Sequence, residues 1–196
     1  MGHQPLLSGA RLRRLRESYA AYIANPDPLM EAGNLLAFVI GTNQPFYPIY
    51  LAFIAGTGAW RALPLMASMP FFLAVPILAR RSKLAARILL VAASIANVVA
   101  AIALMGDRSG VAMLFIPCAA IAAILFRDRE KLWIIGMVAM SMAAWLFTSG
   151  MGPNAFSPDQ YASMQRLNAM SAIGLCGVIG LALAGAVARI ERSRAL

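Results

Sequence analysis

The chain has 196 residues, of which 61% are hydrophobic and only 13% are charged, and it carries a net charge of +9 and a mean hydropathy of +0.72. Soluble globular proteins have about 45–50% apolar and about 25% charged residues, so this composition excludes a soluble domain and indicates an integral membrane protein. Lys and Arg occur in short clusters between apolar runs rather than on one folded face, a pattern typical of the loops of a multi-pass protein, which argues against nucleic-acid binding.

The N-terminal segment, residues 1–29, is polar and basic, and we expect it to lie in the cytoplasm. Between residues 11 and 23 the apolar side chains recur at spacings of three and four, and the arginines lie mostly off that stripe. This pattern predicts a short amphipathic helix that either lies on an anionic membrane surface or docks beneath the protein's own bundle. The prolines at 26 and 28 should end the helix, because proline disfavours helical geometry in the residue before it.

Six apolar segments follow, and they predict an all-α integral membrane bundle of six transmembrane helices over residues 30–188. Each segment is close to the length that crosses a hydrocarbon core of about 30 Å. The connections are short, so each helix is expected to pack antiparallel against its neighbour. The predicted spans are 33–54, 62–79, 85–105, 111–126, 132–148 and 166–188.

Lys and Arg are distributed unevenly between the two sides of the predicted bundle. Fourteen of the 17 lie on the side of the N-terminus, whereas Arg61, Arg108 and Arg166 lie on the other side. Because cytoplasmic loops of membrane proteins carry the excess of positive charge, both termini are predicted to be cytoplasmic in a bacterial inner membrane. Residues 189–196 then form a short basic cytoplasmic tail.

The predicted spans contain no Asp, Glu, Lys or His at mid-membrane depth, and the only histidine in the sequence is His3. Intramembrane proton relays depend on such ionisable groups, so proton-coupled transport is disfavoured. The sequence offers no set of metal ligands and no GxGxxG, GxxxxGK[ST] or GxSxG motif. We therefore expect no catalytic residue, no metal and no cofactor, and interpret the protein as non-enzymatic.

Neutral polar side chains interrupt the first and third predicted spans at similar depth. Asn43 and Gln44 lie about midway along residues 33–54, and Asn97 lies about midway along residues 85–105. An amide in hydrocarbon must find a hydrogen-bond partner. These amides either tie helices together or orient the polar head of a ligand in a pocket with aromatic walls. The candidate ligand-binding residues are Asn43, Gln44, Tyr47, Tyr50, Asn97 and Trp145.

Two further patterns predict how the helices and loops pack. Gly174, Gly177 and Gly180 form a ridge of small residues in the last span, which we expect to pack inside the bundle rather than between two copies of the chain. The charges of residues 127–131, with the sequence RDREK, alternate in sign. We expect them to pair locally in water, where such pairs contribute little to stability.

Three stretches carry a resemblance to known proteins. They are the run Gly41…Pro45-Phe46-Tyr47-Pro48-Ile49-Tyr50, the turn to Trp60-Arg61, and Phe126-Arg127-Asp128-Arg129. With this layout, roughly residues 30–188 resemble the six-span N-terminal sensor modules of bacterial histidine kinases of the quorum-sensing type and of membrane-bound class III adenylate cyclases. The resemblance implies a module that reads a small hydrophobic signal or the state of the lipid and passes a conformational change to a cytoplasmic catalytic domain. No such domain follows residue 188 here, so a separate partner is expected to carry the output.

These observations favour a non-enzymatic sensory or regulatory module in the lipid bilayer. It would bind a small hydrophobic or amphipathic ligand, or a lipid, and signal to a cytoplasmic partner or as a homodimer, without nucleic acid. Two alternatives stay open at this point. One is a small transporter, or substrate-binding membrane subunit, for a neutral solute, and the other is a structural or assembly subunit of a larger membrane complex.

Overall fold

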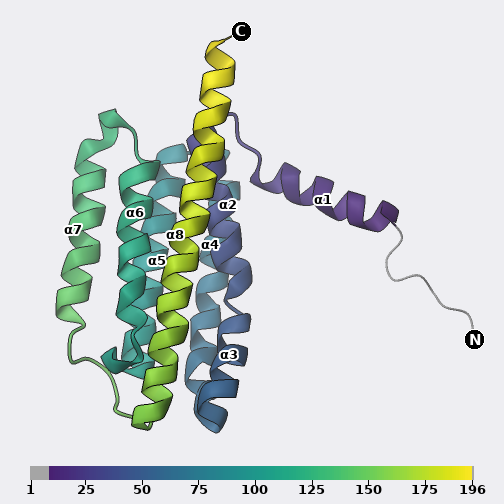
Figure 1. Ribbon diagram of the computed structural model, residues 1–196. Coiled ribbons are helices and arrows are strands. Elements are labelled where there is room, and N and C mark those ends of the chain that lie inside the picture. Colours follow the sequence, from purple (N-terminus) through teal and green to yellow (C-terminus); the bar gives the residue numbers. More distant parts are fainter. Residues whose placement is uncertain (1–8, 196) are drawn as a thin grey trace, which may run out of the picture.

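The computed structural model describes residues 9–195, and within them it contains α-helices and 3-10 helices and no strand. The predicted all-α class is therefore confirmed. The helices of the bundle run up and down along a common axis, and α1 (Gly9–Ile23) projects sideways from them (Figure 1).

α1 covers the range predicted for the amphipathic helix, and the contacts that hold it come from its C-terminal half. The rings of Tyr19 and Tyr22 meet the ring of Phe38 edge-on, with centroids 4.8 and 6.2 Å apart. The Tyr22 hydroxyl also donates a hydrogen bond to the Leu73 carbonyl. Nearer the N-terminus the apolar stripe is uncovered, with Leu15 62% exposed. Residues 1–8 of the predicted N-terminal segment lie outside the described residues.

The first leg of the bundle consists of two stacked helices, α2 (Pro28–Asn43) and α3 (Phe46–Ala55). α2 begins at a favourable site, because the Asp27 carboxylate accepts a hydrogen bond from the Leu29 amide at 3.2 Å and Pro28 occupies the first turn. The helix is interrupted at Gln44 and Pro45, since proline has no N–H to donate to the preceding turn. α3 continues in line with α2 (Figure 1). The range predicted as one span, 33–54, is thus divided in the middle.

Gly56 reverses the direction of the chain. Its φ of +57° lies in the region that glycine adopts without steric cost. After it, the 3-10 helix η1 (Gly56–Ser68), which contains Pro64, and α4 (Met69–Ala79) return alongside α3 and α2 as a second leg. The predicted second span, 62–79, covers most of this leg.

The rest of the bundle is built from longer helices and short 3-10 turns. α8 runs unbroken for 37 residues, so it begins before the predicted position 166 and extends beyond residue 188. Its start is fixed by a capping box, in which the Ser157 hydroxyl and the Gln160 side chain each accept a hydrogen bond from the other residue's backbone N–H. The elements are α5 (Lys83–Met105), η2 (Asp107–Ser109), η3 (Val111–Leu114), α6 (Phe115–Leu125), η4 (Asp128–Glu130), α7 (Lys131–Phe147) and α8 (Pro158–Arg194).

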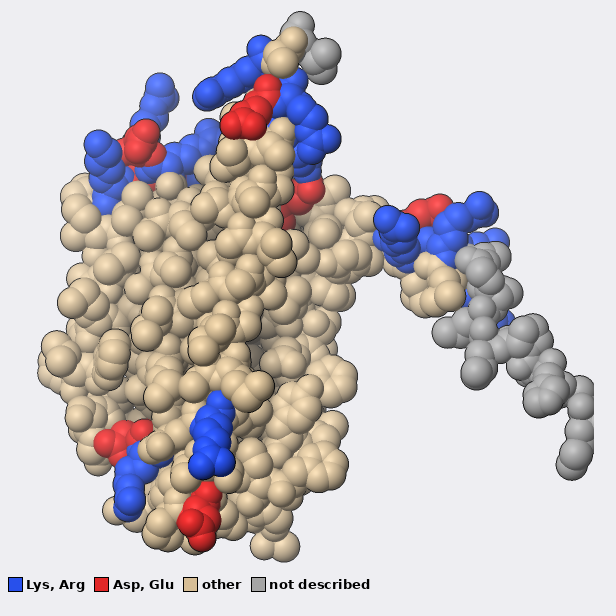
Figure 2. Space-filling view, in the orientation of Figure 1, with Lys and Arg blue, Asp and Glu red and all other residues tan. Residues whose placement is uncertain are grey.

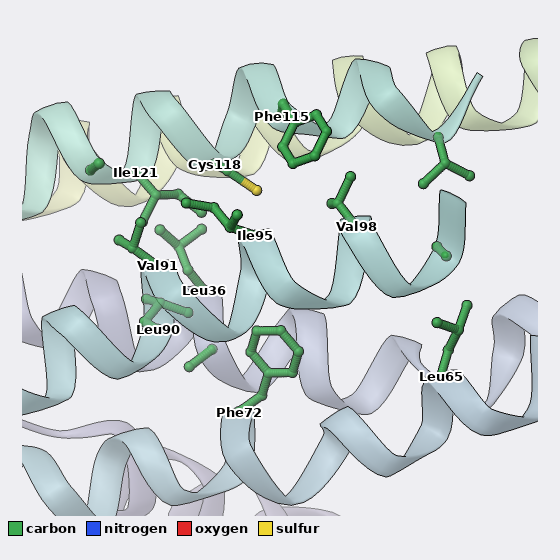
Figure 3. Close-up of a cluster of buried hydrophobic side chains, with 14 of the residues drawn as sticks. Leu36, Leu65, Phe72, Leu90, Val91, Ile95, Val98, Phe115, Cys118 and Ile121 are labelled. Atoms are coloured by element: carbon green, nitrogen blue, oxygen red, sulfur yellow. The ribbon is translucent and has the colours of Figure 1, made fainter. Parts of the chain in front are cut away.

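The interior of the bundle is apolar and centres on α5, which packs against the second leg and α6. Buried side chains of α5, such as Leu90 and Ile95, lie between Phe72 of α4 and Ile121 of α6 (Figure 3). Lipid tails are as apolar as leucine, so inside a bilayer these contacts stabilise the bundle through close packing.

The outer surface of the bundle is that of a membrane protein. Charged side chains gather at its two ends and on α1, and the surface between the ends is uncharged in this view (Figure 2). Among the described residues, 4 helices are long and apolar enough to cross a membrane: Phe46–Ala79, Lys83–Met105, Asp128–Phe147 and Pro158–Arg194. Val111–Leu125 is apolar but shorter. The run Phe46–Ala79 includes the reversal at Gly56, and the count of six spans and the side of each terminus stay predictions.

Candidate functional site

A cavity of about 310 Å³ lies inside the bundle, between the first leg, α5, α6 and α8. Four of the predicted ligand-binding residues line it: Asn43, Gln44, Tyr47 and Asn97. Gln44 is buried, whereas the Asn43 side chain is exposed. Figure 2 shows a hollow in the uncharged face beside α8. The structure therefore brings the amides of the first and third predicted spans to one chamber.

Tyr50 and Trp145 do not line this cavity, so the expected aromatic walls consist of Tyr47 and Phe72 instead. Tyr50 is 44% exposed, because it lies on the outer ridge of α3 beside the exposed Ile49. Trp145 is 48% exposed on α7. That helix packs against α6 and α5 at the margin of the bundle, so its side chains do not reach the chamber.

Asn168 of α8 is a cavity residue that the sequence analysis missed. It is fully buried, and its side-chain N–H group donates to the Ser109 carbonyl at 2.9 Å. Its Oδ1 accepts a hydrogen bond from the Tyr47 hydroxyl at 3.2 Å. The residue lies only two positions inside the predicted last span, where a polar side chain is expected to face the interface. Because α8 begins eight residues earlier, Asn168 instead joins the first leg to α8.

The polar groups of the cavity differ in how many hydrogen bonds they have left to make. The hydroxyls of Ser94 and Ser171 donate to the Leu90 and Leu167 carbonyls, both at 2.8 Å. The Tyr47 hydroxyl is engaged with Asn168. By contrast, Oδ1 of Asn97 is buried and has no hydrogen-bond partner in the described part of the chain. Buried polar atoms are nearly always paired, so this unpaired oxygen at the edge of the cavity is unusual; Oδ1 of Asn34 and Nε of Arg87 are also without a partner in the described structure.

The described residues that line the cavity include no Asp, Glu, Lys, Arg or His. Apart from the amides, the hydroxyls and the thiol of Cys118, the lining is aliphatic or aromatic, with side chains such as Ile40, Val98 and Leu175. A mostly apolar chamber with a few placed polar groups is the usual form of a small-molecule site. The arrangement can hold a neutral or amphipathic molecule.

The glycine ridge of α8 does not pack inside the bundle as predicted. A Cβ atom added at Gly174, Gly177 or Gly180 would meet no atom within 4 Å. Gly177 and Gly180 therefore lie on an open face of α8 and Gly174 borders the cavity, while the helix contacts its neighbours through other residues, such as Ile179 and Ala182. Spacing alone could not show which side of the helix the bundle covers.

A network of ion pairs joins several elements at one end of the bundle, where α2 and α5 begin and α8 leaves, called here the basic end. Arg87 of α5 is 1% exposed, and its guanidinium donates to Asp27 at 2.9 Å and to Glu130 at 2.8 Å. Arg127 donates to the same Asp27 oxygen at 2.6 Å. The expectation that the charges of residues 127–131 pair only locally is therefore wrong, because Arg127 pairs with Asp27 at the start of α2 and Glu130 pairs with Arg87 of α5.

The same end ties α8 to the first leg. Arg189 of α8 pairs with Glu31 of α2, and Glu31 also accepts a hydrogen bond from the Asn25 amide at 3.2 Å. α8 thus contributes Asn168, Ser171 and Leu175 to the cavity and is bound again at the basic end.

The fold and the cavity define a helical membrane module with an internal cavity and a long helix that leads away from it. The family profile of MASE7, a family of membrane-associated sensory domains, matches residues 32–196, so this chain belongs to the MASE7 family. Membership confirms the membrane sensory module of the sequence analysis, while the likeness to histidine kinase and adenylate cyclase sensors stays a resemblance. Neither the curated proteins nor the solved structures contain a match.

Proposed function

We propose that this chain is a non-enzymatic sensory module that binds a small hydrophobic or amphipathic molecule in its internal cavity and signals to a cytoplasmic partner. The observation that carries this proposal is the chamber of about 310 Å³ into which Asn43, Gln44, Tyr47 and Asn97 converge. If the amides served only as ties between helices, Asn97 would be expected to bond to a neighbour, whereas its Oδ1 has no partner in the described structure.

α8 supplies the route from the cavity to the partner. The helix borders the chamber through Asn168 and Leu175 and continues without a break to Arg194, past the ion pair between Arg189 and Glu31. A rigid helix that touches a ligand at one end carries a shift or rotation to its other end. Binding signals in this way only if the ligand has different affinities for two positions of α8. We place the basic end, and with it the end of α8, in the cytoplasm of a bacterial cell.

Native mass spectrometry tests the binding part of the proposal. The protein is extracted gently from its own membrane, and small molecules that remain bound are identified after release. We expect one specific molecule on the wild-type protein and its loss from Asn97→Leu. Asn154→Leu is the matched control, because Asn154 is exposed in the loop between α7 and α8, and this variant should retain the molecule. A wild-type protein that carries nothing, or a molecule equally retained by Asn97→Leu, would contradict the proposal.

A further inference from the structure

Asn97 lies between two hollows. One is the cavity, and the other is an apolar groove of about 440 Å³ between the second leg and α5, which shares Asn97 and Leu65 with the cavity. The groove is lined by residues that face outward, including Phe71, which is 55% exposed, and Ala96. It therefore opens toward the lipid, and the unpaired amide of Asn97 stands at its inner wall.

The chemistry of Asn97 limits the head group that it can bind. An asparagine presents a carbonyl oxygen and an NH₂ group of nearly the same shape, so a group that both donates and accepts satisfies the amide in either orientation. Hydroxyl and amide groups do both. A carboxylate only accepts, and a quaternary ammonium does neither. Because no charged residue among those described lines the cavity, a charged head would also lose its water without gaining a counter-charge.

The size of the groove limits the tail. Its volume of about 440 Å³ is large enough for a single hydrocarbon chain of medium length. Besides Asn97, its walls offer that chain alanine, leucine, phenylalanine and proline side chains and one serine, Ser68, whose hydroxyl donates to the Leu65 carbonyl at 2.8 Å.

We propose that the site takes a single-chain amphiphile with an uncharged hydroxyl- or amide-bearing head, hydrogen-bonded to Asn97 in the cavity, and with its chain in the groove between the second leg and α5. This inference rests on the proposed function, since it specifies the ligand class of the same cavity. It implies that the ligand enters sideways from the bilayer and not from water.

The test uses the full chain in lipid nanodiscs and three photoreactive decyl probes that differ only in the head: a hydroxyl, a carboxylate and a trimethylammonium. Labelled peptides are mapped by mass spectrometry, and unlabelled 1-decanol is the competitor. We expect saturable labelling of α4, α5 and α8 by the hydroxyl probe, at concentrations at least about tenfold below those of the charged probes. This comparison is made on the wild-type protein, so it does not depend on any variant's folding.

Two variants with matched controls test the two parts of the site. Asn97→Leu should weaken the hydroxyl probe about tenfold, as expected for one buried hydrogen bond, whereas Asn154→Leu should not. Ala96→Phe fills the groove from its lipid-facing side and should weaken all three probes severalfold. Ala103→Phe places the same side chain at an exposed position of α5 outside the groove and should leave labelling unchanged.

The outcomes separate this inference from the proposed function. Equal saturable labelling by a charged probe, or an unaffected Asn97→Leu, overturns the uncharged head on Asn97 and leaves the cavity as a binding site. Absence of saturable labelling, in protein that carries a small molecule in native mass spectrometry, overturns the amphiphile class alone. Absence of both overturns the inference and the proposed function together.

Discussion

Arg87 is buried at the basic end with a carboxylate on either side, so replacing it leaves Asp27 and Glu130 without their main partner. We expect Arg87→Met to lower the free energy of unfolding by about 3–5 kcal/mol, the usual cost of breaking a buried ion pair from one side. Arg13 is the matched control, since its pair with Glu17 is exposed on α1, and Arg13→Met should cost less than about 1 kcal/mol. Unfolding by sodium dodecyl sulfate in mixed micelles measures both, and equal losses would refute the role given to Arg87.

Glycines in two environments give a second prediction at this scale. Gly106 has a φ of +86°, and a Cβ there would lie 2.5 Å from the Pro153 carbonyl oxygen. We expect Gly106→Ala to destabilise the protein by more than about 1 kcal/mol, because the new side chain meets backbone and an unfavourable φ together. Gly177→Ala, in open space on α8, should change stability by no more than about 0.5 kcal/mol. Thermal unfolding of the two variants in the same detergent measures this difference in stability. Equal stabilities would show that the turn after α5 is mobile enough to accept the side chain.

The residues that could be predicted from the sequence are those that contrast with their surroundings. Gln44 and Asn97 stand out as amides within long apolar runs, and the structure brings both to the cavity. Asn168 and Arg87 were missed because each lies near the end of its predicted span, where polar residues are ordinary. Their partners, Tyr47 and Asp27, are far away in the sequence, and no local pattern shows such pairings.

The lengths of the apolar runs predict where the helices lie. The interruptions of the helices depend on backbone geometry, which hydropathy does not predict. Pro45 and Gly56 mark where the first leg breaks and where the chain reverses. The 3-10 form of η1 around Pro64 was not predicted, because a hydropathy pattern does not distinguish a 3-10 helix from an α-helix. The wrong prediction for the glycine ridge of α8 has a similar cause. The spacing of the glycines shows that they share one face of the helix, but only the packing of the neighbouring helices decides whether that face is covered.

α1 is the element that we expect to detach most easily. Its attachment is the contact of Tyr19 and Tyr22 with Phe38 and the hydrogen bond to Leu73. Replacing both tyrosines by alanine should free α1 and raise hydrogen exchange throughout residues 11–23, because few other contacts protect these amides. The bundle helices should keep their exchange rates. Unchanged exchange in α1 would show that the membrane surface, and not the bundle, holds this helix.

For the whole molecule, the distribution of charge predicts six spans with both termini in the cytoplasm. Reporter fusions test this directly: an alkaline phosphatase fused after residue 58, 108 or 152 should be active, and one fused after residue 82 or 129 should not. The positions at 58 and 82 decide between six spans and fewer. If the run Phe46–Ala79 crossed the membrane only once, residue 58 would lie inside the bilayer, and that fusion would not report as an outer loop.

We expect an occupant of the cavity to change the position of α8, and the distance between the basic end of the bundle and the tip of α8 measures this change most directly. Spin labels at Arg81→Cys and Ser193→Cys, with Cys118 and Cys176 replaced by alanine, report that distance by double electron–electron resonance in nanodiscs. We expect different distance distributions for protein emptied by detergent and for protein refilled from an extract of its own membranes. Asn97→Leu should give the distribution of the emptied protein in both conditions. Identical distributions for empty and refilled wild-type protein, with the occupant verified by mass spectrometry, would contradict this expectation.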